Sequence, residues 1–164
     1  MPPASPPIDE LATILAAHLS DEQVGAAVAQ VLSDAEEAIS YYQPMCWNRG
    51  DCCQFGAAGH KLYVTVPELI CFDQTHPPAP VQNGADTCPY QREGRCTARA
   101  ARPLGCRVYF CQASARWWQP TVTEEHLRRL RDIGGRFGLP HLYVEWLFGL
   151  KALYSVSRNS KGSP

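Results

Sequence analysis

The sequence contains no long hydrophobic run. Nowhere in its 164 residues do about 18 apolar residues follow one another, so a membrane-spanning helix is excluded. The N-terminal stretch also lacks the basic start and the continuous apolar segment of a secretory signal peptide. We therefore expect a cytoplasmic protein.

The formal net charge is only −1. Such a small charge argues against general electrostatic binding to nucleic acid. The charges are nevertheless distributed unevenly. Residues 1–45 carry seven acids and no Lys or Arg, whereas residues 92–136 carry ten arginines and four acids. Either an acidic helical face lies near a basic one, or the arginines compensate a buried anionic centre or bind an anionic partner.

Neither disorder nor a second domain is indicated. The composition is 45% hydrophobic and 19% charged, which is typical of a globular protein, and the length suits one core. We therefore expect a single domain over residues 1–164, with disordered ends at residues 1–7 and 158–164.

Helical periodicity is confined to the two ends of the chain. Apolar spacing predicts a helix over residues 8–18 and a second helix that begins after Ser20 as N-cap and continues to about Tyr42. Pro44 then prevents its continuation.

In the last third, Thr121 or Thr123 is expected to cap a helix that ends at Gly138. A final helix is predicted over residues 140–156. It is apolar on almost all sides, which favours a place in the core over an oligomer interface.

The middle of the chain shows little regular periodicity. A short strand is predicted over residues 62–66, one helical turn begins at Pro67, and residues 74–87 resemble a long exposed loop. The predicted fold class is therefore mainly α, with helices at both ends wrapped around an irregular middle with little strand. We expect this middle to need an internal crosslink, since it has too few ordered elements to bury a core.

Eight cysteines are the unusual feature of the composition, and all lie within residues 46–111. In a reducing cytoplasm, clustered cysteines hold metal more often than they form disulfides. Thiolates are soft anionic ligands that suit Zn²⁺ or an iron–sulfur cluster. The cysteines are Cys46, Cys52, Cys53, Cys71, Cys88, Cys96, Cys106 and Cys111.

Two segments carry the cysteine pattern. The first reads CWNRGDCC from Cys46 to Cys53; the second combines Cys88-Pro-Tyr, Gly-Arg-Cys96 and RPLGCRVYFC, which ends at Cys111. Together they resemble the bacterial YkgJ-type cysteine-cluster family, whose signature is CxxCxxCC and which is described as zinc- or iron-chelating. Related domains occur in flagellin lysine N-methylases. The resemblance covers about residues 46–111.

The resemblance implies a set of metal ligands. Every cysteine except Cys71 matches a family position, so the expected ligands are Cys46, Cys52, Cys53, Cys88, Cys96, Cys106 and Cys111. Cys71 lies in an apolar setting and is expected to be a small buried side chain. Arg49 occupies the second cysteine position of the signature and cannot ligate a metal, so that ligand is lost or replaced, with His60 and His76 as candidate replacements.

Arg102 and Arg107 lie within a few residues of the expected ligands. They could donate N–H groups to the sulfurs and tune a metal centre, or they could simply pair with acids. The two interpretations remain open.

The kind of metal centre is less well determined. The sequence has neither the paired CxxC motifs of zinc ribbons nor a ferredoxin spacing. The adjacent pair Cys52 and Cys53 is awkward for one tetrahedral zinc, which slightly favours an iron–sulfur cluster over Zn²⁺.

The leading hypothesis is a cytoplasmic metal-binding protein whose metal is at least structural, with redox chemistry left open. One alternative is an enzyme similar to the lysine N-methylases, although no Gly-rich strand-to-helix turn for a methyl-donor cofactor is present. Another is a zinc-stabilised adaptor that binds an anionic partner through the arginines. A protein partner or a second copy could bind the apolar C-terminal helix.

Overall fold

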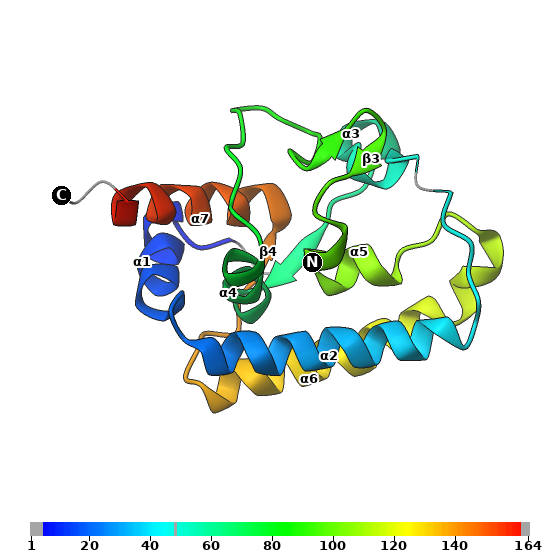
Figure 1. The fold of residues 1–164 in the computed structure, drawn as a ribbon, viewed down its shortest axis with the longest axis horizontal. Helices are drawn as coiled ribbons and strands as arrows, with labels where there is room; N and C mark the ends of the chain where they lie inside the picture. Colours follow the sequence, from blue (N-terminus) through cyan, green and yellow to red (C-terminus); the bar gives the residue numbers. More distant parts are fainter. Residues whose placement is uncertain (1–4, 48, 162–164) are drawn as a thin grey trace.

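The computed structural model describes residues 5–47 and 49–161, and in this part of the chain the fold is mainly α, as predicted (Figure 1). The α-helices are α1 (Ile8–His18), α2 (Glu22–Ser40), α3 (Phe55–Ala58), α4 (Val66–Thr75), α5 (Leu104–Val108), α6 (Gln119–Arg136) and α7 (Trp146–Lys161). Three short 3₁₀ helices are η1 (Asp51–Cys53), η2 (Arg99–Ala101) and η3 (Ala113–Trp117).

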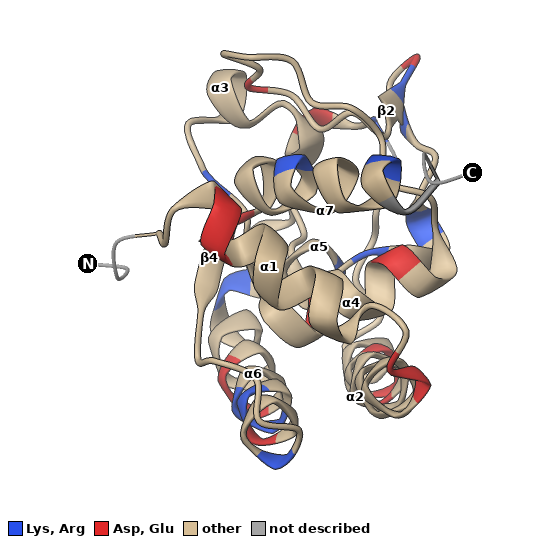
Figure 2. Cartoon of the chain, turned by 90° about the vertical axis from the view of Figure 1, so that its left-hand side faces the viewer, with Lys and Arg blue, Asp and Glu red and all other residues tan. Residues whose placement is uncertain are grey.

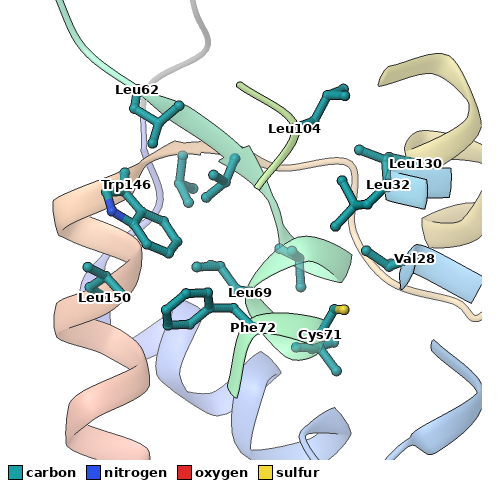
Figure 3. Close-up of a cluster of buried hydrophobic side chains, with 14 of the residues drawn as sticks. Val28, Leu32, Leu62, Leu69, Cys71, Phe72, Leu104, Leu130, Trp146 and Leu150 are labelled. Atoms are coloured by element: carbon teal, nitrogen blue, oxygen red, sulfur yellow. The ribbon is translucent and has the colours of Figure 1, made fainter. Parts of the chain in front are cut away.

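Helix α4 lies at the centre of the core. It packs against α1, α2, α6 and α7, and α2 and α6 run side by side along one edge of the molecule (Figure 1). Its side chains Leu69, Ile70 and Phe72 are almost fully buried (Figure 3). The expectation that residues 46–111 contribute no adequate core is therefore wrong, because the predicted single turn at Pro67 is a ten-residue helix.

Two short strands tie the middle of the chain to its last third. Strand β1 (Tyr63–Thr65) leads directly into α4, and β4 (Tyr143–Glu145) leads directly into α7. They pair antiparallel with Val64 opposite Val144, and both valines are completely buried. A second antiparallel pair, β2 (Gln91–Arg92) with β3 (Arg95–Cys96), forms a small hairpin.

Several predicted boundaries shift in the structure. Asp21, not Ser20, caps α2 by accepting backbone N–H bonds from its first turn. The last helix begins at Trp146 because the residues before it pair with β1, and it continues through residues 158–161, which were expected to be disordered. The predictions for residues 1–4 and 162–164 lie outside the described residues.

Ion pairs between helices account for part of the uneven charge distribution. Figure 2 shows α2 with acidic and no basic residues beside the arginine-bearing α6. Asp34 on α2 pairs with Arg129 on α6, and Glu36 on α2 pairs with Arg107 on α5. The interpretation of an acidic helical face near a basic one therefore holds for these residues.

Helix α7 belongs to the core, as favoured from its pattern. Leu147, Leu150 and Leu153 are buried, and the helix packs against α1. Among the described helices, none combines the length and the apolar character needed to cross a membrane.

Candidate metal centre

One cavity brings together the seven cysteines that were expected to bind metal. Cys46, Cys52, Cys53, Cys88, Cys96, Cys106 and Cys111 all line it. Its empty volume is about 900 Å³, part of which is open to solvent. Cys71 does not line this cavity and lies on the α2 side of α4, whereas Trp146 lies on its α7 side (Figure 3). The structure thus separates the cysteines in the way that the sequence motif does.

The inner wall of the cavity is formed by backbone segments that are far apart in the sequence. Cys52 and Cys53 lie on η1, which follows Gly50. Gly50 has a φ of 73°, and a Cβ atom there would lie 2.8 Å from the carbonyl oxygen of Gly94 in the β2–β3 turn. Cys88 is fixed beside this segment because its backbone N–H donates to the Cys53 carbonyl at 2.8 Å.

The outer wall carries Cys46 and Cys111, two of the three exposed cysteines. Cys46 and Cys111 lie on neighbouring segments, since the Met45 N–H donates to the Gln112 side-chain oxygen at 3.0 Å. Both cysteines are exposed, whereas Cys53 and Cys88 are buried. The seven thiols therefore extend from the inside of the cavity to its mouth.

The Cys53 thiol is the centre of the inner group. Hydrogen bonds with the Cys53 thiol lower the pKa of Cys52 and that of Cys96 to about 6 each, and they lower the pKa of Cys88 as well. The same hydrogen bonds raise the pKa of Cys53 well above its usual range, and the one with Cys52 has the largest effect. Burial raises the pKa of Cys106. Cys52 and Cys96 thus favour the thiolate form beside a thiol that keeps its proton, an arrangement that a soft cation would stabilise.

Trp146, at the start of α7, donates a hydrogen bond to this group. Its indole N–H lies 3.4 Å from Cys88 Sγ, and the residue is only 2% exposed. A buried N–H needs an acceptor, and a thiolate accepts far better than a neutral thiol. Nothing in the sequence pattern links Trp146 to a cysteine 58 residues away.

The arginines near the cysteines divide into two groups. Arg99 and Arg102 line the cavity, the charge of Arg102 lowers the pKa of Cys52 and of Cys96, and Arg99 Nη1 lies 4.0 Å from Cys46 Sγ. Arg107 does not line it. Its guanidinium donates to the carbonyl oxygens of residues 100 and 102 and pairs with Glu36.

Arg107 therefore fixes the backbone that carries Arg99 and Arg102. None of its described hydrogen bonds goes to a sulfur, so of the two interpretations made for it, pairing with an acid is the one that fits.

The buried carboxylate of Glu68 positions the helix that carries Cys106. Glu68 Oε2 accepts from the Thr65 N–H at 2.7 Å and from the Thr65 hydroxyl at 2.8 Å, and Oε1 accepts from the Leu104 N–H at 2.8 Å. Burial raises the pKa of Glu68, and these donors oppose that rise. The carboxylate thus joins the β1–α4 corner to the first residue of α5.

Replacing Glu68 with Gln should destabilise the protein by about 1–3 kcal/mol. The amide can offer its oxygen to Thr65 or to Leu104, and its NH₂ group then faces the other N–H donor and leaves it unsatisfied. The midpoint of urea unfolding measures this loss. Glu37→Gln is the control, since Glu37 is exposed, and it should stay within about 0.5 kcal/mol of the parent. Equal midpoints for both variants would show that Glu68 does not hold α5.

The two histidines considered as replacement ligands lie outside the cysteine cavity, and His60 lines a neighbouring pocket together with Cys52 and Cys106. His60 stacks on Tyr109 with ring centroids 5.3 Å apart, and His76 packs against Phe72 and Tyr90. Neither lines the cysteine cavity. Arg49, at the position of the missing cysteine, lines the cavity, pairs with Asp51 at 3.3 Å and lies over the Trp47 ring.

In residues 5–47 and 49–161, no three His, Cys, Asp or Glu side chains converge closely enough to hold a metal ion as they stand. The inner cysteines are neighbours, and metal binding would draw their sulfurs closer together. Their donor chemistry fits a soft metal, since several thiols share one cavity with the Trp146 N–H and three arginines.

Comparison of the chain with protein-family models, curated proteins and solved structures found no match. The family resemblance of the cysteine motif therefore remains an expectation, and the function has to be argued from the cavity.

Proposed function

We propose that this protein binds a cysteine-ligated metal centre, an iron–sulfur cluster or Zn²⁺, in the cavity between η1, the β2–β3 hairpin and α5. The observation that carries the proposal is the distribution of the cysteines. The seven that belong to the motif line one cavity, and the eighth, Cys71, is outside it. The motif and the cavity thus select the same seven residues.

The electrostatics of the cavity support a bound cation. Gathering thiolates brings negative charges together, which costs free energy unless a cation neutralises them. Trp146 and Arg102 lower this cost only in part, because a hydrogen bond and a partly exposed guanidinium do not cancel several charges. A metal would complete the neutralisation and release the proton of Cys53.

The adjacent pair Cys52 and Cys53 favours a cluster over a single ion. A tetrahedral zinc needs four sulfurs about 2.3 Å from one point, which two neighbouring residues of η1 supply poorly. A cluster of several iron and sulfide ions distributes its ligands over more than one metal ion.

The metal would also join loops that the helical core holds only in part. Residues 46–54 and 87–111 carry all seven cysteines, while the core is built largely from α1, α2, α4, α6 and α7. We propose that the protein works in a reducing compartment such as the cytoplasm, where the thiols stay free to bind metal.

A reconstitution experiment tests this function. Metal-free, reduced protein is titrated anaerobically with Zn²⁺, and separately with ferrous iron and sulfide, while the absorption spectrum is recorded. We expect saturation at a fixed stoichiometry with one of the two, together with protection of the cysteines from alkylation. If neither metal protects any cysteine, the function proposed here is wrong.

Trp146→Phe should weaken the metal centre without removing it. Phenylalanine keeps an aromatic ring against Phe72 but loses the N–H that faces Cys88. Loss of a hydrogen-bond donor to a metal ligand typically lowers metal affinity about tenfold to hundredfold. Competition with a chelator measures the affinity. Trp118→Phe is a matched control, since Trp118 is also buried but does not line the cavity, and an equal loss in both variants would exclude a role for the Trp146 N–H.

A further inference from the structure

Large apolar side chains gather on the surface around the mouth of the cysteine cavity. Six large hydrophobic residues are exposed in the described chain, and five of them lie on two adjoining segments. We call these five the mouth patch: Tyr41, Met45, Trp47, Tyr109 and Trp117, which are 85%, 59%, 56%, 44% and 70% exposed. The sixth, Ile8, lies on α1 at the opposite end of the molecule (Figure 1).

The mouth patch is one surface rather than scattered side chains. Tyr42 contacts both Tyr41 and Trp117, with ring centroids 5.5 and 5.2 Å apart, and so joins the end of α2 to η3. Met45, Trp47 and Tyr109 line the mouth of the same cavity. The patch therefore continues from the end of α2 to the edge of the cysteine site.

We propose that the mouth patch is the interface of a homodimer, in which a second copy of this chain covers the open side of the cysteine cavity. This goes beyond the proposed metal binding and does not depend on it.

The area of the patch is suited to such an interface. Aromatic side chains bury 150–250 Å² each, so these exposed fractions correspond to about 600 Å² per copy. A standard interface buries about 800 Å² per partner, which the polar surroundings of the patch would complete. Exposed apolar patches of this size are at the upper limit for a monomer.

Charges of both signs lie beside Tyr41 and Trp117, the two most exposed residues of the patch. Glu37 precedes Tyr41 by one helical turn, and Arg116 directly precedes Trp117. Neither has an ion-pair partner among the ion pairs of the described residues. A rim that carries both signs can pair with itself across a two-fold axis. The acid of each copy can then face the base of the other copy, so that each contact occurs twice.

A homodimer would also change the exposure of the cysteine site. Cys46 and Cys111, the exposed thiols beside the patch, would be shielded from solvent along with Trp47. The apolar C-terminal helix, considered from the sequence as an oligomer interface, is buried inside the protomer and does not supply this contact.

Sedimentation velocity over a range of protein concentrations tests the proposal, with the protein in the form in which it is purified. We expect a monomer–dimer equilibrium. Trp117→Ser should raise the dimer dissociation constant about thirtyfold or more, the effect of a central aromatic residue. Tyr41→Ser should weaken the dimer as well, and it provides a second variant should Trp117→Ser perturb the packing of Tyr42.

Ile8→Ser is the matched control, since it removes an exposed apolar side chain outside the patch and should leave the equilibrium unchanged. Far-UV circular dichroism checks that each variant is folded. A protein that stays monomeric at all concentrations, or a dimer that Ile8→Ser weakens and the two patch variants do not, would overturn the proposal. Metal content is measured separately, so failure of the dimer leaves the proposed metal binding intact.

Discussion

Cys53→Ser should cause the largest loss of bound metal of any single substitution in the chain. Cys53 is the residue with which Cys52, Cys88 and Cys96 all form side-chain hydrogen bonds, so it stands at the centre of the inner thiols. A serine hydroxyl at this position is a hard, neutral oxygen that binds a soft metal poorly. Loss of a hydrogen-bond donor to a ligand can lower metal affinity about hundredfold. We expect loss of the ligand itself to lower it further. Metal content after equilibration with a chelator measures the loss.

Cys71→Ala is the matched control for this experiment. Cys71 is a buried residue of α4 that lies outside the cavity, and burial raises the pKa of its thiol, so it should contribute only packing. We expect unchanged metal content and a loss of stability of about 1 kcal/mol. Equal metal loss in Cys71→Ala and Cys53→Ser would mean that the cavity does not define the ligands.

Removal of the metal should loosen the cysteine-bearing loops and leave the helical core folded. The binding free energy of such a site is folding free energy for the segments that it joins. The core around α4 is largely formed by side chains that do not line the cavity. After chelation we expect faster amide hydrogen exchange in residues 46–54 and 87–111. Exchange in α2, α4, α6 and α7 should change little, and the far-UV spectrum should stay helical.

Hydrogen exchange followed by mass spectrometry resolves these segments. The Cys53→Ser variant, which should hold no metal, serves as the control and should not respond to the chelator. If exchange rises uniformly along the chain, the metal supports the whole domain. If the exchange does not rise anywhere, the metal has no structural role.

The helical ends of the fold could be predicted from the sequence because they are amphipathic and local. Val24, Val28 and Val31 recur at helical spacing, and the structure buries all three on α2. Helix α4 was underestimated because residues 69–72 form an uninterrupted apolar run without helical periodicity, although Thr65 and Glu68 form a capping box at its start. The spacing of Thr65 and Glu68 was the signal that could have identified the helix.

The sequence predicted which cysteines line the cavity, but it did not predict the other residues that contact them. The motif separates Cys71 from the other seven, and the cavity does the same. The contacts of Trp146 with Cys88 and of Glu68 with the start of α5 join residues 58 and 36 positions apart, and they depend on how β4 pairs with β1 and α5 packs on α4. The two interpretations of Arg107 stayed open for a related reason, because sequence proximity to Cys106 does not fix where the guanidinium points.

The most direct test of the central claim is the metal and acid-labile sulfide content of protein purified without oxygen. We expect one centre per chain at a fixed stoichiometry. A cluster would contain iron and sulfide and absorb visible light, whereas a zinc centre would be colourless. Cys71→Ala should have the same content and Cys53→Ser almost none. Protein that is folded, free of iron and zinc, and has the exposed thiols of Cys46, Cys52 and Cys111 open to alkylation would contradict it.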